Sequence, residues 1–239
     1  MQPSYFELIG FGPDGWGKAL LAAALMTVSV ASSGFMFGSV VGAIVASFKL
    51  SRFVVLRFAA DVYITVLRGV PDLLVIYLLY FGGSSTITAI AKYLGGSGFV
   101  SIPSFAAGVC ALGIISGAFQ GELFRGAFLA LGKGELEAAR SFGMDRWLML
   151  SRIIVPQVIR YAIPGMGNIW QLALKESALI SVIGLVEILR QSQMGAGATA
   201  RPFDFYITAF FLYLTITWAS GNALKWVERR SMRGVRRAV

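Results

Sequence analysis

The sequence predicts an all-α membrane protein, and three observations support that fold class. The chain has 239 residues, of which 56% are hydrophobic and 14% charged, whereas soluble domains carry about 25% charged residues. Its mean hydropathy is +0.72. The runs 19–48, 73–91 and 205–224 contain no charged residue over 30, 19 and 20 positions. Because a bilayer core about 30 Å thick needs about 20 helical residues, we expect a single transmembrane domain over 1–239.

Five membrane-spanning helices are expected, at about 19–48, 54–81, 102–124, 158–186 and 204–226. The second and fourth are interrupted by charges. Pro71 removes a backbone donor and should kink the second helix. The outside connections 82–85 and 95–98 are short and rich in Gly and Ser, so they should form loops and not a soluble receptor domain. No internal repeat is seen, which disfavours a carrier built from two repeated halves.

Basic residues predict the orientation of these helices. Fifteen fall on one side: Lys49, Arg52, Arg57, Arg125, Lys133, Arg140, Arg146, Arg152, Arg160, Lys225, Arg229, Arg230, Arg233, Arg236 and Arg237. Four fall on the other: Lys18, Lys92, Arg190 and Arg201. Since cytoplasmic loops carry the excess of Lys and Arg, the N-terminus should lie outside and the C-terminus in the cytoplasm.

The composition also excludes several kinds of chemistry. The chain has no histidine and a single cysteine, Cys110, which excludes histidine-dependent catalysis, histidine metal ligands and an intrachain disulfide. We expect no catalytic residue, no metal site and no cofactor. The net charge of +9 suits cytoplasmic loops better than nucleic acid in a chain this apolar. The segment 1–18 carries Glu7 and Asp14 without a basic leader, so it does not resemble a cleaved signal peptide.

The long connection 125–157 is expected to form a helical hairpin on the cytoplasmic surface. Good helix formers fill 135–142, and Gly143 follows where a left-handed residue would end that helix. Asp145 can cap a second helix that begins at about Arg146. Ala138 and Ala139 would give the hairpin a small-residue face onto which another protein could pack.

The same connection carries a spaced motif. Glu137-Ala138-Ala139 is followed by Gly143, then by Ile153 and by Val155-Pro156. This pattern resembles the signature of the inner-membrane permease subunits of binding-protein-dependent ABC importers, which is Glu-Ala-Ala, three residues, Gly, nine residues, Ile, one residue, Leu-Pro. Val155 in place of Leu is the single departure. A surface hairpin without a partner is the alternative interpretation.

Further segments are similar to the polar amino-acid branch of these permeases, in particular to the Q-type permeases for histidine, for lysine, arginine and ornithine, and for octopine and nopaline. These segments are 68–72, Glu122 with Arg125-Gly126, and 168–183. The resemblance covers about residues 19–237. It implies a type I ABC importer fold, a multi-pass position in the bacterial inner membrane, and uptake of polar or basic amino acids or opines.

The resemblance also implies that the protein works without enzymatic activity of its own. In the family, the segment that carries Glu137, Ala138, Ala139, Gly143, Ile153 and Pro156 is the coupling helix, which docks on an ATP-hydrolysing subunit. This chain has no Gly-rich phosphate loop, so ATP must be hydrolysed by another polypeptide. The implied partners are two copies of that ATP-binding subunit, a second homologous permease, a periplasmic substrate-binding protein and membrane lipids.

Charges at membrane depth mark a candidate substrate pathway. Arg68 lies 11 residues past Arg57, which is about 16 Å along a helix. Asn168, Gln171 and Lys175 share one helix face, and Glu176 is adjacent. Intramembrane charges usually line a cavity or pathway, and a zwitterionic amino acid needs counter-charges of both signs.

Structural pairing is the alternative for each of these charges. Arg68 could pair with Asp72 or Asp61, while Glu122 and Arg125 form an i,i+3 pair near the surface. Lys175 and Glu176 could tie the fourth span to its neighbours or to a second permease. Two other functions compete with the importer subunit, an ion-coupled carrier that works without an ATPase and a membrane anchor for a peripheral complex.

Overall fold

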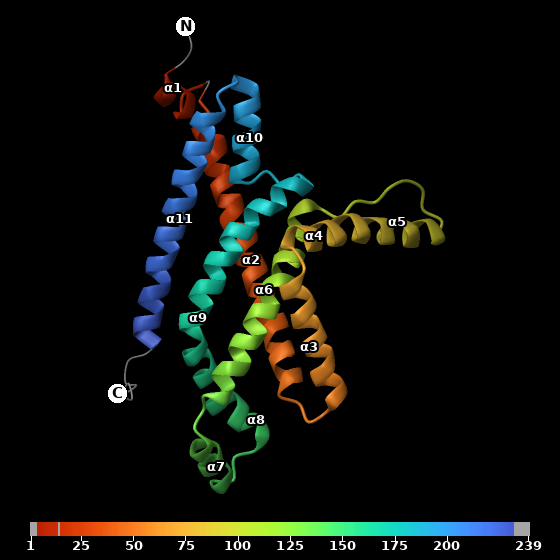
Figure 1. The fold of residues 1–239 in the computed structure, drawn as a ribbon, viewed down its shortest axis with the longest axis vertical. Helices are drawn as coiled ribbons and strands as arrows, with labels where there is room; N and C mark the ends of the chain where they lie inside the picture. The colour runs from red at the N-terminus through yellow and green to blue at the C-terminus, as the bar shows by residue number, and fades with distance from the viewer. Residues whose placement is uncertain (1–3, 14, 232–239) are drawn as a thin grey trace.

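The computed structural model describes residues 4–13 and 15–231. Every regular element among these residues is a helix. In chain order the elements are α1 (Tyr5–Ile9), α2 (Gly17–Lys49), α3 (Val54–Gly69), α4 (Asp72–Tyr77), η1 (Leu78–Gly82), α5 (Gly83–Tyr93), α6 (Ser104–Leu129), α7 (Lys133–Ser141), α8 (Arg146–Met149), η2 (Leu150–Ile154), α9 (Val155–Glu176), η3 (Ser177–Ile183), α10 (Ile188–Thr199) and α11 (Pro202–Ser231). Figure 1 shows α1 at one end of the bundle and α7 at the other.

The bundle is built around the long pair α2 and α6. Small residues allow the two backbones to approach closely, as in other membrane helix pairs. A Cβ added at Gly38 would lie 2.0 Å from Ser116 Oγ, and one at Gly42 would lie 2.8 Å from Gln120 Cβ. The fully buried Gln120 joins the pair with polar contacts, because Ser39 Oγ donates to its Oε1 over 2.6 Å.

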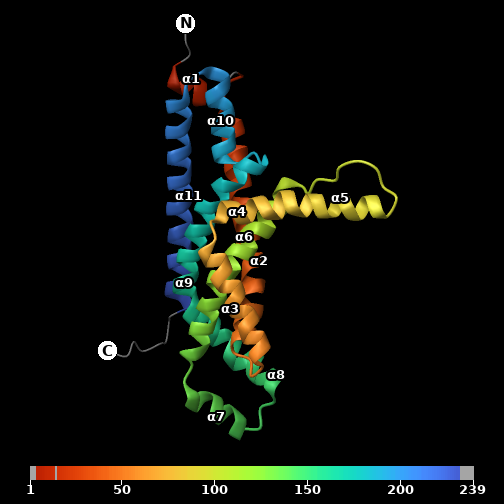
Figure 2. The same ribbon diagram turned by 45° about the vertical axis from the view of Figure 1, so that its right-hand side comes forward.

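The second expected span, 54–81, is wrong, because the chain does not continue as one helix over these residues. Helix α3 ends at Gly69, Val70 and Pro71 are extended with ψ near 140° and 132°, and a new helix begins at Asp72. Pro71 thus breaks the helix where a kink was expected, because it follows a residue that already favours extended backbone. Helices α4, η1 and α5 then form an arm that points away from the bundle in both ribbon views (Figures 1 and 2).

The expected loop at 82–85 is also wrong, because these residues belong to the arm. A π-helical turn, η1, continues α4 directly into α5. The hydroxyl of Ser84 accepts a hydrogen bond from Ile102 N over 3.1 Å, and Thr88 bonds both backbone groups of Val100. These side chains tie α5 to the segment that returns along it. The expected loop at 95–98 is confirmed, with Gly95 and Gly98 at positive φ.

The fourth expected span, 158–186, is helical over α9 only as far as Glu176. A 3-10 helix, η3, follows, and Gly184 at φ 89° ends it. The Ser177 hydroxyl donates to the Leu174 carbonyl, a local bond that competes with the regular helical pattern. The first, third and fifth expected spans correspond to α2, α6 and α11, each longer than expected.

In the part of the chain that the structure describes, four helical stretches are long and apolar enough to cross a membrane: Gly17–Lys49, Asp72–Tyr93, Ser104–Leu129 and Pro202–Ser231. Helix α9 is not among them, and the second stretch is the arm instead of 54–81. The exact span count and the orientation therefore stay predictions. Arg233, Arg236 and Arg237, which contributed to the orientation, lie outside the described residues.

Candidate functional site

The hairpin at 125–157 has the local geometry that the sequence predicts. Helix α7 ends at Ser141, and Gly143 adopts the left-handed conformation at φ 73°. The chain turns there with Gly143 N donating to Arg140 O over 2.9 Å and Met144 N donating to Ala139 O over 3.1 Å. Asp145 then caps the next helix, because its carboxylate accepts hydrogen bonds from Trp147 N and Leu148 N.

The second helix of the hairpin begins at Arg146 as expected, but it does not end within the hairpin. Helix α8 runs through the π-helical turn η2 directly into α9, so the chain is helical from Arg146 to Glu176. The π turn lies immediately before Pro156, whose nitrogen cannot donate to the preceding turn. The hairpin is therefore joined rigidly to a helix that crosses the bundle.

The outer surface of the hairpin is open and partly apolar. Glu137 and Ala138 are exposed, whereas Ala139 is buried, so the expected small-residue face is reduced to Ala138. Phe142 and Trp147, on either side of the Gly143 bend, are 88% and 76% exposed. The sequence analysis did not identify this aromatic pair as a contact surface. The signal for it was available, because both residues lie next to the predicted turn at Gly143. Exposed aromatic side chains at such a bend are typical of a docking surface.

The remaining predicted coupling residues connect the hairpin to the bundle. Ile153 is half-buried in η2, and Pro156 is exposed in the first turn of α9. Glu135 accepts a hydrogen bond from Gln157 Nε2 over 2.5 Å. This bond joins α7 to α9, so a displacement of α7 would act on the helix that carries the candidate pathway.

The predicted pathway residues of α9 lie on two sides of the helix. Asn168 and Lys175 are exposed and Gln171 is half-buried, all on one face, while Glu176 is buried. Within residues 4–13 and 15–231, Lys175 makes no ion pair. The α9 face that carries Asn168 and Lys175 is thus exposed and could contact a neighbouring molecule.

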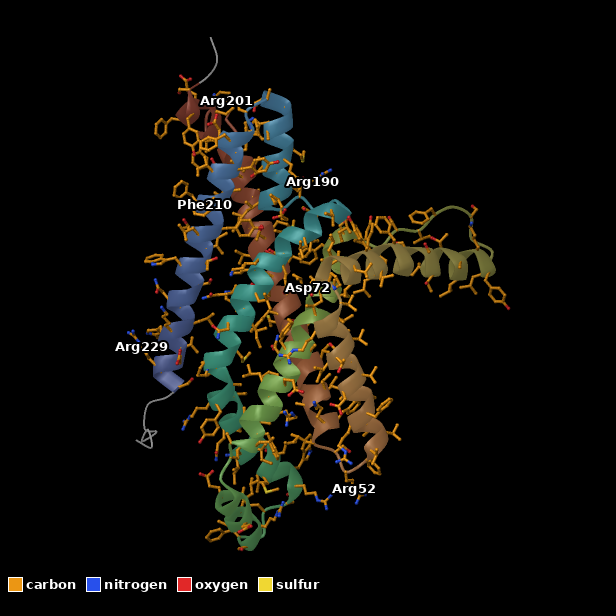
Figure 3. All side chains as sticks on the ribbon, in the orientation of Figure 1. Arg52, Asp72, Arg190, Arg201, Phe210 and Arg229 are labelled. Atoms are coloured by element: carbon orange, nitrogen blue, oxygen red, sulfur yellow. The ribbon has the colours of Figure 1, made fainter. Side chains whose placement is uncertain are left out.

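Glu176 has a partner that sequence reasoning did not assign to it. Its carboxyl lies close enough to that of Asp72 for the two charges to interact; Asp72 is the first residue of α4, which Figure 3 shows where the arm leaves the bundle. Two carboxylates in contact repel each other unless a proton or a cation lies between them. The pair is therefore a place where a positively charged group would be stabilised. No signal along the chain links these two residues.

Arg68 makes neither of the ion pairs considered for it. Its guanidinium lies 4.8 Å from the centre of the Phe119 ring, and the side chain is exposed. Asp61 is instead held by Lys49 at 2.7 Å. Arg68 is therefore held over an aromatic ring of α6 by a cation–π contact.

A charged network connects three helices at the hairpin end of the bundle. The predicted pair of Glu122 and Arg125 is confirmed at 2.9 Å. Lys49 Nζ lies 2.5 Å from Glu122 Oε1 as well as 2.7 Å from Asp61 Oδ1. The network thus joins α2, α3 and α6, which supports the structural interpretation of Glu122 and Arg125.

A second buried carboxylate, Glu187, was also missed. It caps α10 by accepting from Leu189 N and Arg190 N, and Tyr213 donates to its Oε2 over 2.8 Å. Thr27 of α2 accepts from the neighbouring Ile188 N. These bonds satisfy a fully buried acid and fix the contact between α2, α10 and α11.

The hairpin motif and the all-helical architecture agree with a known protein family. Residues 38–235 match the family described as "Binding-protein-dependent transport system inner membrane component". The chain belongs to this family. It is a transmembrane permease subunit of an ABC importer, located as a multi-pass protein in the bacterial inner membrane.

Individual relatives agree with the family assignment. The permease is 56% identical over 235 residues to the octopine transport system permease protein OccQ of Rhizobium meliloti, an alignment that covers 98% of this chain and 99% of that protein. It is 47% identical over 230 residues to the nopaline transport system permease protein NocQ of Agrobacterium fabrum, covering 96% and 98%.

A solved structure supports the same fold. A crystal structure of an amino acid ABC transporter with histidines matches with a TM-score of 0.77 at 31% identity, over 96% of this chain and 100% of that one. The resemblance inferred from the motif and the type I importer fold are confirmed. The ion-coupled carrier finds no support, because these relatives are ABC transport permeases, a family that implies an ATP-binding subunit and a binding protein as partners.

Proposed function

We propose that this permease forms one half of a pathway for polar or basic amino acids or opines, with Asp72 and Glu176 receiving the cationic group of the substrate. The observation that carries the proposal is the proximity of these two carboxyls, which belong to separate helices of the bundle. Desolvation of such a pair is costly unless a cation, a proton or water compensates it. The names of the octopine and nopaline relatives support the substrate class.

Lys175 supplies the opposite charge in this proposal. It is adjacent to Glu176 in the sequence, exposed, and without an ion pair in the part of the chain described here. A basic amino acid or opine offers a carboxylate for Lys175 and a positive group for the acidic pair. Asn168 and Gln171 lie on the Lys175 face and add hydrogen-bonding groups, and Arg68 adds a second cation.

The partners follow from which faces of the permease are open. Two copies of an ATP-binding subunit would serve the complex, one on the hairpin of this chain at Phe142 and Trp147, with Glu137, Ala138 and Gly143 setting its geometry. A second homologous permease would close the pathway against the open α9 face and the arm. A periplasmic binding protein would deliver substrate at the opposite end from the hairpin. The permease itself would hydrolyse no ATP.

The test is uptake by proteoliposomes that contain the assembled transporter. Lys175→Met and Glu176→Gln should preserve assembly and the ATPase activity stimulated by the binding protein, while uptake falls at least about tenfold. Lys225→Met, an exposed lysine of α11, is the matched control and should transport normally. If the two variants fail to assemble, Lys175 and Glu176 have a structural role in the complex. If both variants assemble and transport normally, Lys175 and Glu176 are not part of the substrate pathway.

A further inference from the structure

The exposed face of α11 changes from apolar to basic along the helix. Phe211 and Trp218 are 53% and 69% exposed. Arg229 follows them by 18 and 11 residues, which are about five and three helical turns, so the three side chains share this face. Thr217 and Leu224, on the side toward the bundle, are half-buried. Because α11 is long and apolar enough to cross a membrane, the apolar part of its exposed face is in contact with lipid.

The length of α11 places its last turn at the level of the lipid headgroups. The helix has 30 residues, which is about 45 Å at 1.5 Å per residue. A bilayer core with both headgroup layers is about 40–45 Å thick. Trp226, near the end of the helix, is 61% exposed, and tryptophan concentrates at the boundary between acyl chains and headgroups. The residues that follow Trp226 therefore meet the headgroup layer.

Two arginines follow Trp226 on this face. At about 100° per residue, Arg229 is turned about 60° to one side of Trp226 and Arg230 about 40° to the other. The Arg230 Cζ lies 5.5 Å from the centre of the Trp226 ring, and Figure 3 shows Arg229 at the end of α11, at the edge of the molecule. Within residues 4–13 and 15–231 neither arginine forms an ion pair. Glu228 is half-buried and turned about 160° from Trp226, so it does not neutralise them.

The protein partners proposed above belong to other surfaces. In both ribbon views α11 lies on the opposite side of the bundle from the arm (Figures 1 and 2). The hairpin surface at Phe142 and Trp147 lies further along the long axis than the end of α11 (Figure 1). The two arginines therefore continue a face that contacts lipid, and neither proposed protein contact includes them.

We propose that Arg229 and Arg230 bind the phosphate of an anionic glycerophospholipid in the leaflet at the hairpin end of the molecule. An acyl chain would lie along the exposed face of α11, with Trp226 beside the glycerol. Guanidinium groups match phosphate oxygens in geometry and charge, and basic residues directly beyond a membrane-spanning helix attract anionic lipids. A zwitterionic lipid carries its own cation beside the phosphate, so it gains less. The proposal is independent of the substrate that the permease carries.

The test is a local photo-cross-link in the intact transporter, reconstituted with its ATPase into vesicles of equal phosphatidylglycerol and phosphatidylcholine. A benzoylphenylalanine replaces Asn222, an exposed residue one turn before Trp226, and mass spectrometry gives the ratio of the two lipid adducts. The wild-type arginines should favour phosphatidylglycerol. The double variant Arg229→Gln/Arg230→Gln should lower the ratio about 25-fold, or about fivefold for each arginine.

The matched control removes two cations elsewhere. Lys92→Gln/Arg190→Gln, at exposed positions of α5 and α10, lowers the net charge equally and should leave the adduct ratio unchanged. An equal ratio in the wild type and the arginine variant, or an equal fall in the control, would overturn the proposal. Adducts to another protein chain in place of lipid would overturn it as well, because they would show that a subunit covers this end of α11.

Discussion

The hairpin and the pathway differ in how their functional residues are placed. In the hairpin, Gly143 at φ 73° and the Asp145 cap act within a few residues of each other, and the contact surface of Phe142 and Trp147 is exposed. In the pathway, Asp72 and Glu176 lie 104 positions apart in the chain and come together because α4 packs against η3, which directly follows Glu176. The first region is set by backbone geometry and the second by tertiary packing, so substitutions should affect them differently.

The strongest contrast is expected in a labelling experiment, because a cysteine at either end of the molecule should react with an impermeant thiol reagent from one side of the membrane only. In a Cys110→Ser background, Phe142→Cys should react with an impermeant thiol reagent only after the inner membrane is permeabilised. Ser97→Cys, in the loop that follows the arm, should react once the reagent reaches the periplasm. Labelling of position 142 from outside would reverse the orientation and place the hairpin beyond reach of a cytoplasmic ATPase.

The next largest effect is expected from Gly143→Val. A β-branched residue is strained at positive φ, although open space surrounds this glycine. The turn should misorient α7, and co-purified ATPase should fall about tenfold or more while the chain still inserts.

Gly134→Val is the matched control for the bend. Gly134 also has open space around it, but its φ is not in the left-handed region, so the ATPase should remain bound. Wild-type association of Gly143→Val would show that the bend is not needed for coupling.

A smaller effect, confined to transport, should follow from Asp72→Asn. If Asp72 and Glu176 act as a unit, the single variants Asp72→Asn and Glu176→Gln should each lower uptake about tenfold, and the double variant should be little worse than either. Asp61→Asn, an acid that pairs with Lys49 instead, should keep near-normal uptake. If the fold-losses of uptake in the two single variants multiply in the double variant, Asp72 and Glu176 do not act as one site.

The smallest effect is expected on stability alone. Lys49→Met removes the cation that joins Asp61 and Glu122, whose side chains are 56% and 20% exposed. Because such partly exposed ion pairs contribute about 1 kcal/mol, the melting temperature of the permease in detergent should fall by about 2–4 °C. Arg52→Met, which removes a cation from an exposed cation–π contact, should shift it less. If the melting temperature falls equally in both variants, the ion pairs of Lys49 with Asp61 and Glu122 add no more stability than the exposed contact of Arg52.

Elements that depend on neighbouring residues could be predicted from the sequence. The expected spans 19–48, 102–124 and 204–226 correspond to α2, α6 and α11, since about 20 predominantly apolar residues are stable in a bilayer only as a helix. The left-handed Gly143 and the capping Asp145 follow from side-chain chemistry that acts over a few positions. The spacing from Glu137 to Pro156 was sufficient to indicate the family.

Where the chain turns and which charges come together depend on how the helices pack. Pro71 predicts an interruption, but the direction of the arm depends on contacts such as Ser84 with Ile102 and Thr88 with Val100. The contacts of Glu176 with Asp72 and of Glu187 with Tyr213 join residues on separate helices. A single sequence records the preferences of each segment, whereas such pairs arise from how helices pack, and packing is a property of surfaces that no local pattern describes.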